Sequence, residues 1–367
     1  MKNEEEMAAS PRLSTTDDAR ENMKTNRRGF TKTLVTAGAA LAAGRAFAGP
    51  ATSNLRSNYA FDKAETPVIL EVAINGSVKK KVNPTAPETP AEIAAHSIQC
   101  LDAGATIVHA HTNKPMEDAQ AAARVYIEAF QPVREKHPHA ILYPTANFDP
   151  SVYHENRRPW KPEIQCGHYR PLAESGAANM VLFDTGVVPI AVYDEKGMIP
   201  EEKFWWYGFW PGDNKIAHDV CTGLGTGASI SVFEPGWMKN VVAMARAGTL
   251  PRGSKVIMYF ADYGWAGMAP PIPEALQLYL HMIEGLDLKW TIGLVGGCIM
   301  DTPLARMALE RGGSFRVGLE DYWSGPSNVE QLKRAKEIID SVGRPVVTGA
   351  DAIKYLDIPF PATRPNA

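Results

Sequence analysis

The chain has 367 residues, of which 45% are hydrophobic and 22% charged, and its formal net charge at pH 7 is −3. Partners such as nucleic acid or an anionic membrane are not expected, because proteins bind both through basic surfaces. The length allows one large domain or two ordinary ones, and a small molecule is the expected ligand.

The N-terminal segment differs in composition from the rest of the chain. Residues 1–26 are polar and charged, Arg27 and Arg28 follow, and a mild apolar run spans Leu34–Gly44. Small alanine side chains then stand at positions 46 and 48, where a signal peptidase needs them. This order of segments resembles a twin-arginine export signal, although a basic, alanine-rich tail is the alternative interpretation.

The resemblance to an export signal leads to three expectations. Residues 1–48 would be a leader and signal peptide, residues 49–66 a linker, and the mature protein would lie outside the cytoplasm, in the periplasm. The apolar run is too short to span a bilayer stably, because a spanning helix needs about 20 apolar residues. We therefore expect no membrane span in the mature chain.

From Pro67 onward, short β-branched runs alternate with longer segments of helical period. This alternation is typical of repeated βα units around a parallel sheet. Eight repeats in order predict a closed (β/α)8 barrel, a TIM barrel, formed as a single domain by residues 67–367. The predicted strands are Val68–Ile74, Thr106–His111, Ala140–Thr145, Asn179–Asp184, Ser229–Glu234, Lys255–Ala261, Lys289–Val295 and Ser314–Leu319.

The first helix has a well-defined start. Thr89 offers an N-cap hydroxyl, Pro90 suits the first helical position, and the Glu92 carboxylate can reach back to the cap. A helix is therefore predicted from here to about Gly104, where glycine can end it. Further helices are expected after the last three strands, at Pro273–Ile283, Pro303–Arg311 and Asn328–Val342.

Two segments interrupt the regular alternation. Pro150–Leu172 and Pro189–Gly227 are predicted to be irregular excursions after the third and fourth strands. The second contains the aromatic run Phe204–Trp210. These rings either form a wall that faces the substrate or make the core of an inserted loop, and the sequence leaves both interpretations open.

In such barrels the chemistry lies on loops at the carboxyl ends of the strands. His109 and His111 end the second predicted strand, and side chains two apart on a strand point to the same side. The pair therefore has metal-ligand spacing. His137 and His139 have the same spacing but precede the third strand, so we expect them in a solvated loop. The four cysteines form no C-x-x-C pair, which disfavours a thiolate site.

A catalytic zinc ion usually takes three protein ligands and keeps one open position. Closure of the barrel places the last strand beside the first, and the second strand lies on the other side of the first. Glu320, after the last strand, is therefore the candidate third ligand. Asp321 is a candidate base, oriented and kept ionised by Arg316. A structural Arg–carboxylate pair is the alternative. Zinc is the expected ion, and manganese or iron would also fit.

Two threonines are weaker candidates. Thr145 follows the third predicted strand and Thr185 the fourth, so both lie at the expected active end of the barrel. Their hydroxyls could donate hydrogen bonds to an enolate or carboxylate oxygen, although threonine is as common in ordinary turns.

Four motifs together resemble those of the β-keto acid cleavage enzymes, the 3-keto-5-aminohexanoate cleavage family. The resemblance covers the chain from Pro67 to the C-terminus. The two histidines and the last-strand motif, in this order and separation, are quite specific. The motifs are Glu71–Gly76, Thr89–Ala94, Asp102–His111 and Arg316–Asp321.

The family consists of zinc-dependent (β/α)8 barrels that convert a β-keto acid and acetyl-CoA into acetoacetate and a new CoA ester. The resemblance implies zinc on the two histidines and Glu320, with Asp321 as base and Arg316 as its partner. It also implies that Thr145 and Thr185 stand at the positions of the family's hydroxyl groups. A homo-oligomer is expected.

This chain also departs from the family pattern. Asn113 and Lys114 stand where many relatives have an Arg-Asp pair, and an acid that meets the amino substrate of the founding member is replaced near Val78. An amine-bearing substrate is therefore not expected. Export conflicts with the use of acetyl-CoA, a cytoplasmic metabolite. Either the N-terminal segment is not an export signal and the protein is cytoplasmic, or the reaction is a metal-assisted C–C cleavage or hydrolysis without CoA.

Two other functions match part of the pattern. Metal-dependent hydrolases of the amidohydrolase style also pair an early His-x-His with a late carboxylate. They need further histidines after strands five and six, where this chain has Glu234 and Asp262. A non-catalytic exported solute-binding barrel would use the pocket and the aromatic run, and it would need no metal.

Overall fold

The computed structural model describes residues 65–112, 118–147 and 161–359. The predicted export signal, the linker to residue 64, Asn113, Lys114 and the start of the first excursion lie outside these ranges. Among the helices of the described ranges, none is both long and apolar enough to cross a membrane.

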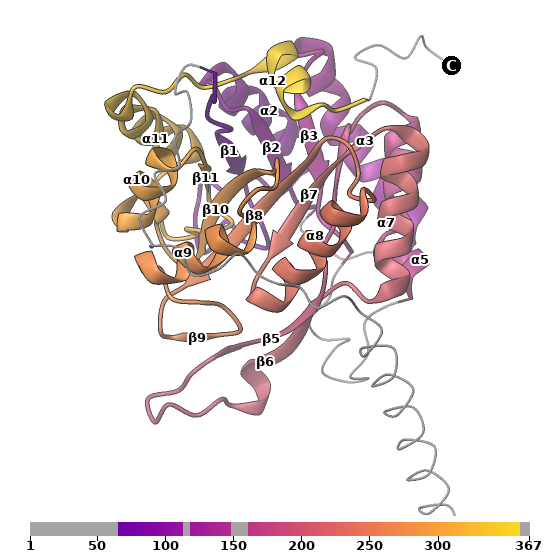
Figure 1. Ribbon diagram of the computed structural model, residues 1–367. Coiled ribbons are helices and arrows are strands. Elements are labelled where there is room, and N and C mark those ends of the chain that lie inside the picture. The colour runs from indigo at the N-terminus through magenta and orange to yellow at the C-terminus, as the bar shows by residue number, and fades with distance from the viewer. Residues whose placement is uncertain (1–64, 113–117, 148–160, 360–367) are drawn as a thin grey trace, which may run out of the picture. The chain divides into compact units, whose positions relative to one another are not determined.

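Eight parallel strands form a nearly closed barrel, as predicted (Figure 1). In hydrogen-bonded order around the barrel they run β3, β2, β1, β11, β10, β8, β7 and β4. The strands are β1 (Glu71–Ala73), β2 (Ile107–Ala110), β3 (Ile141–Pro144), β4 (Met180–Leu182), β7 (Gly227–Val232), β8 (Ser254–Ala261), β10 (Lys289–Val295) and β11 (Ser314–Val317).

Asn179 bridges the seam between β3 and β4. Asn179 Oδ1 accepts a hydrogen bond from the Leu142 amide at 3.1 Å, and Asn179 Nδ2 donates to the Ala140 carbonyl at 3.1 Å. The Asn179 amide also donates to the Leu142 carbonyl at 3.4 Å. The Asn179 side chain thus supplies hydrogen-bond partners that the backbone of a neighbouring strand supplies in a regular parallel sheet.

The predicted helices are present. The first begins as expected, because Thr89 Oγ1 accepts from the Glu92 amide at 3.2 Å and Glu92 accepts from the Thr89 amide at 3.1 Å. The helices are α2 (Pro90–Asp102), α3 (Ala119–Lys136), α5 (Pro162–Gln165), α6 (Tyr169–Glu174), α7 (Pro211–Leu224), α8 (Pro235–Ala247), α9 (Pro273–Met282), α10 (Pro303–Glu310), α11 (Asn328–Val342) and α12 (Gly349–Leu356).

The excursion after β4 is more regular than the sequence indicated. It contains β5 (Val187–Val192) antiparallel to β6 (Phe204–Gly208), and β9 (Trp265–Ala266) pairs with the other edge of β5. It also contains α7, which begins with a proline in its first turn and ends at Gly225 with φ of +74°. A proline in the first turn and a glycine after the last turn are typical helix boundaries, so α7 could have been predicted from the sequence.

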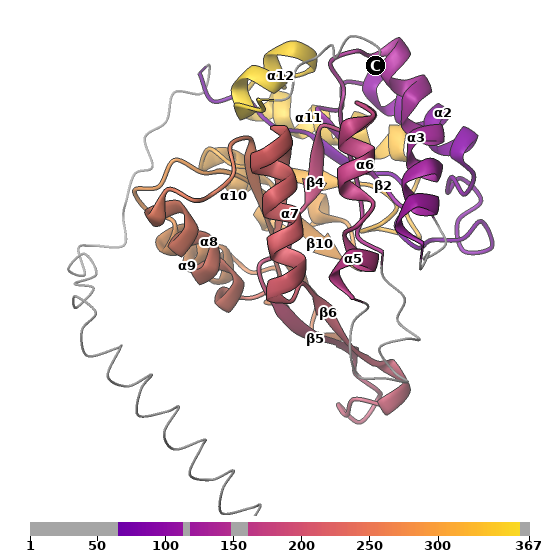
Figure 2. The same cartoon turned by 90° about the vertical axis from the view of Figure 1, so that its right-hand side faces the viewer.

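The three-stranded sheet and α12 lie at opposite ends of the barrel (Figures 1 and 2). The strands between them are almost completely buried, because helices cover their outer faces and side chains fill the interior. Since β5 follows β4 and β9 follows β8 along the chain, the sheet stands at the carboxyl ends of the barrel strands, where the candidate residues were expected.

Candidate metal and active site

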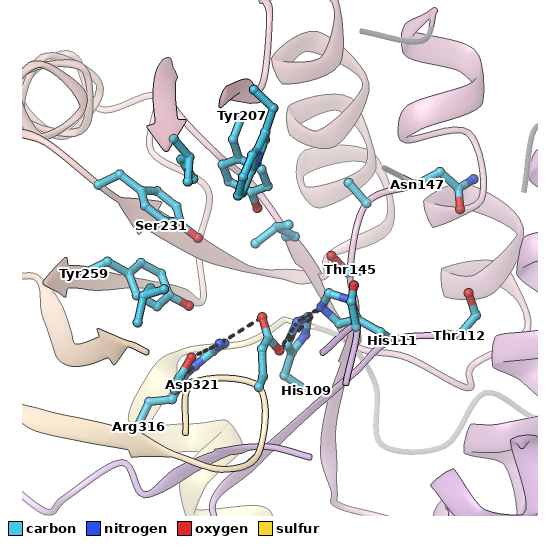
Figure 3. Close-up of a pocket in the computed structure, with 18 residues that line it drawn as sticks. His109, His111, Thr112, Thr145, Asn147, Tyr207, Ser231, Tyr259, Arg316 and Asp321 are labelled. Atoms are coloured by element: carbon cyan, nitrogen blue, oxygen red, sulfur yellow. Dashed lines mark hydrogen bonds and ion pairs between the residues drawn. The ribbon is translucent and has the colours of Figure 1, made fainter. Parts of the chain in front are cut away.

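Three side chains predicted to bind a metal meet at the carboxyl end of the barrel (Figure 3). His109 Nε2 and His111 Nε2 are 3.1 Å apart, and Glu320 Oε2 lies 3.3 Å from the first and 3.4 Å from the second. The order of the strands explains this convergence, because β1 pairs with β2 on one side and β11 on the other.

The geometry fits a divalent ion. Ligand atoms at about 2.0–2.1 Å from a tetrahedral zinc are separated by roughly 3.3 Å, close to the three distances observed. Glu320 Oε2 is buried and accepts no hydrogen bond from the described residues. Two imidazole nitrogens and one carboxylate oxygen facing a single point are stabilised by a cation placed among them.

His109 is held in the form that a metal requires. Its Nδ1 lies 3.3 Å from the Tyr143 carbonyl oxygen, which can accept the ring N–H and leave the Nε2 lone pair directed at the site. Burial lowers the pKa of His109 well below its usual range, and this effect outweighs the opposing Glu320 carboxylate. The imidazole is therefore neutral, as a ligand must be.

His111 is fixed through its backbone by a residue that sequence reasoning had not assigned. Asn75 Oδ1 accepts from the His111 amide at 2.8 Å, and Asn75 Nδ2 donates to the His111 carbonyl at 2.9 Å. The same Nδ2 donates to the Pro87 carbonyl at 3.0 Å. Asn75 thus orients the end of β2 from the loop after β1.

Two glycines allow the first and last strands to present their loops side by side. Gly76 has φ of +53°, and a Cβ at this position would lie 2.6 Å from Glu320 Cγ. Gly318 has φ of +129°, and a Cβ there would lie 2.2 Å from the Ala73 carbonyl oxygen. Glycine is required at both places, because a side chain would displace Glu320 or its strand.

Asp321 and Arg316 form the predicted pair. Arg316 Nε donates to Asp321 Oδ2 at 2.9 Å and Nη2 donates to Oδ1 at 2.8 Å, a bidentate arrangement. Nη2 also lies 3.1 Å from Glu320 Oε1. The guanidinium therefore links the candidate base to the candidate ligand.

The two neighbouring carboxyl groups have different acidities. Burial raises the pKa of Asp321 to about 6, although Arg316 opposes the rise. Burial also acts on Glu320, but Arg316, followed by His111, outweighs it and holds the pKa of Glu320 well below its usual range. Such a division suits Glu320 to ligation and Asp321 to proton transfer.

A charged network lies behind Arg316 in the barrel interior. Glu71 Oε1 accepts from the Tyr143 hydroxyl and lies 3.4 Å from Arg316 Nη1, and Glu71 Oε2 pairs with Lys255 Nζ. Lys255 also donates to Ser229 Oγ at 2.9 Å. Glu71 and Lys255 are completely buried. Sequence reasoning missed this network, although a Glu and a Lys inside predicted buried strands were a signal for it.

The two threonines lie in different surroundings. Thr145 lines the pocket, and Figure 3 shows it beside His111. Thr185 is buried, and its hydroxyl donates to the Trp237 carbonyl at 3.1 Å. It is not among the pocket-lining residues of the described chain, and its catalytic role stays a prediction. Ser231 on β7 lines the pocket, and sequence reasoning had not singled it out.

The predicted site residues other than Thr185 share one pocket with a volume of about 260 Å³. The predicted ligands, Arg316, Asp321 and Thr145 form one part of its lining. Part of the aromatic run forms another, because Trp205 and Tyr207 of β6 face the pocket. Trp206 and Trp210 are 40% and 45% exposed. The run is therefore partly a pocket wall and partly surface.

Comparison with known proteins gives a consistent result. Residues 67–358 match the family model described as beta-keto acid cleavage enzyme. The chain is 27% identical over 304 residues to the 3-oxoadipate:acetyl-CoA acetyltransferase of Cupriavidus necator, covering 80% of this chain and 95% of that protein. It is 24% identical over 300 residues to the 3-keto-5-aminohexanoate cleavage enzyme of Acetoanaerobium sticklandii, covering 79% and 98%.

Solved structures support the fold. The apo structure of ObcA superposes with a TM-score of 0.56 at 17% identity, covering 76% of this chain and 66% of that chain. This chain thus spans just under two thirds of ObcA. The sequence match to the family model, in contrast, extends from before β1 to beyond α12. The protein therefore belongs to the β-keto acid cleavage enzyme family.

Proposed function

We propose that this protein is a zinc-dependent enzyme that transfers the acyl group of a β-keto acid to CoA, with acetyl-CoA as co-substrate and acetoacetate as second product. The observation that carries the proposal is the convergence of His109, His111 and Glu320 beside the Arg316–Asp321 pair in one pocket. The names of two relatives, an acetyl-CoA acetyltransferase and an acetyl-CoA acetone transferase, support acetyl-CoA as co-substrate.

The proposed reaction is balanced without redox chemistry. R–CO–CH2–COO⁻ and acetyl-CoA give acetoacetate and R–CO–S-CoA. A divalent ion, when bound, supplies a Lewis acid that withdraws electron density from the keto oxygen. Asp321 accepts a proton from the CH2 carbon, and the Arg316 guanidinium keeps both of its oxygens oriented during the transfer. Thr145, on the pocket wall, is suited to donate a hydrogen bond to an oxygen that gains negative charge.

The alternatives have less support. Among the described residues that line the pocket, His109 and His111 are the histidines, whereas an amidohydrolase-style site would need more. A solute-binding barrel has no need of a carboxyl group whose pKa is raised to about 6 beside a ligand-type triad. A CoA-independent cleavage would use the same site, and it is distinguished from acyl transfer by its products.

We expect the metal to depend on the two histidines. Wild-type protein should bind about one zinc ion per chain, and a His109→Ala/His111→Ala variant should retain less than about a tenth of it, because one carboxylate alone holds zinc weakly. His137→Ala/His139→Ala is the matched control, since this pair has the same spacing but His137 contacts Asp102, 3.0 Å away, before β3. Equal zinc in all three proteins, measured by atomic emission, would refute the site.

The same zinc-loaded proteins test the reaction. Wild type and the control should form acyl-CoA and acetoacetate from β-keto acids only when acetyl-CoA is present, and the double variant should form neither. Turnover without acetyl-CoA would rule out acyl transfer in favour of CoA-independent cleavage.

We also propose that the protein is exported through a twin-arginine-type signal. The support is the order of Arg27, Arg28, the apolar run and the alanines at 46 and 48 in the sequence. N-terminal sequencing of protein purified from its native cells should begin at Gly49. A native chain that still carries Arg27 and Arg28 would contradict export. The predicted homo-oligomer stays a prediction.

A further inference from the structure

The part of the pocket lining that the structure describes is charged on one side. There the charged residues other than the histidines are Arg316, Glu320 and Asp321, which lie together on and after β11. The rest of the described lining is neutral. It combines polar side chains such as Thr145 and Asn147 with an aromatic wall formed chiefly by Trp205, Tyr207 and Phe233. Tyr259 joins this wall to the charged side, because the Arg316 guanidinium lies 5.2 Å from the centre of its ring. Figure 3 shows Tyr207 and Tyr259 on the side of the pocket away from Thr145 and Asn147.

The charged groups are already engaged with one another. Arg316 donates hydrogen bonds to Asp321 from Nε and Nη2. Its Nη2 also forms an ion pair with Glu320, and its Nη1 forms one with Glu71. Glu320 is in turn directed at the two histidines. A second charge on the substrate would therefore find no uncommitted counter-charge among the pocket residues that the structure describes. Burying a charged group without a partner is strongly unfavourable.

The aromatic wall is held in place by ring packing. Phe233 stacks on Tyr259 with centroids 4.7 Å apart and an interplanar angle of 17°, and Tyr207 meets Phe233 edge-on at 5.1 Å. The interlocked rings form a preformed aromatic surface that is largely apolar. Apolar groups gain most from such a surface, and flat rings gain additionally by offset or edge contacts.

The antiparallel pair β5–β6 supplies the remaining part of the wall. Alternation along β6 places Trp205 and Tyr207 on one face and Trp206 on the other, and Ile190 of β5 pairs with Trp205 on the pocket side. Trp206 instead packs against Phe204, with ring centroids 5.5 Å apart, and is 40% exposed. Neighbouring tryptophans on one strand thus have different surroundings.

We infer that the acyl substituent of the substrate is uncharged and apolar, an aryl or short alkyl group, and that Trp205 is a specificity-determining residue for it. The inference rests on the proposed β-keto acid cleavage. It assigns the charged side of the pocket to the shared β-keto carboxylate part and the aromatic wall to the variable group R.

Binding of size-matched acids tests the inference independently of turnover. Zinc-loaded wild type is titrated calorimetrically, without acetyl-CoA, with 3-oxohexanoate, 3-oxoadipate and 5-amino-3-oxohexanoate, which carry a neutral, an anionic and a cationic six-carbon chain. 3-Oxo-3-phenylpropanoate is the aryl probe. We expect the neutral and aryl acids to bind at least about tenfold more tightly than either charged acid. Equal or tighter binding of a charged acid would overturn the inference.

Trp205→Ala provides the second measurement, with Trp206→Ala as the matched control. Trp205→Ala should weaken binding of the aryl acid by about tenfold or more, whereas Trp206→Ala should change it by less than about twofold. Thermal denaturation verifies that both variants are folded, and Trp205→Phe should recover most of the affinity. Equal affinities for the two alanine variants would show that Trp205 does not form the acyl subsite.

Adding acetyl-CoA to the same samples separates the two proposals. Preference for neutral acids together with acyl-CoA formation supports both. Preference without acyl-CoA formation refutes the proposed transfer and leaves the assignment of the pocket intact. Acyl-CoA formation with a preference for charged acids refutes only the inference.

Discussion

Replacing Lys255 by methionine should lower the free energy of unfolding by about 3–5 kcal/mol, because the change leaves Glu71 Oε2 buried without its ionic partner. Methionine fills nearly the same volume, so little of the loss should come from a cavity. Urea unfolding of the zinc-loaded protein, followed by circular dichroism, measures the change.

A double variant distinguishes a lost charge partner from lost packing. Glu71→Gln/Lys255→Met removes both charges, so it should recover more than half of the lost stability. Lys215→Met is the surface control, since Lys215 pairs with Asp219 on the exposed side of α7 and should show no measurable change. A double variant as unstable as Lys255→Met would mean that the charge pair is not the cause.

The same network matters for the site because Glu71 also faces Arg316. The two residues pair in register on β1 and β11, and Arg316 Nη1 lies 3.4 Å from Glu71 Oε1. Lys255 reaches Glu71 from β8, which is separated from β1 by two strands, so the contact crosses the barrel interior. Glu71 is therefore a positioning residue for the guanidinium that orients Asp321.

The barrel was predictable because each repeat carries its own local signal. Parallel strands covered on both faces read as continuous apolar runs, and the capping residues around Thr89 mark a helix start independently of tertiary contacts. The approach of His109 and Glu320 also followed from topology, since a closed barrel must bring the first, second and last strands together.

The features that the sequence did not reveal depend on side-chain direction or distant contacts. Alternation could assign Trp205 and Tyr207 to one face only once β6 was known to be a strand. Nothing local shows that the Thr185 hydroxyl turns to the Trp237 carbonyl. The Glu71–Lys255 pair joins residues far apart in the chain, so their proximity emerges only from the closed barrel.

Asp321→Asn should lower kcat by about 10²–10⁴ if Asp321 is the base, because an amide cannot accept the substrate proton. Zinc content and the affinity for 3-oxohexanoate should stay within about twofold of wild type, since the triad of ligands is unchanged. The measurement is the rate of acyl-CoA formation at saturating acetyl-CoA, with zinc determined on the same sample.

Asp301→Asn is the matched control for this substitution. Asp301 also pairs with an arginine, Arg334, but on the surface and outside the pocket-lining residues of the described chain, so its variant should keep the wild-type kcat. The asparagine amide at 321 would also face Arg316 donors, and Asp321→Glu tests this complication because it restores a carboxylate. Partial recovery of kcat in Asp321→Glu is expected. A kcat for zinc-loaded Asp321→Asn within about tenfold of wild type would place the base elsewhere, because loss of a general base costs at least about a hundredfold.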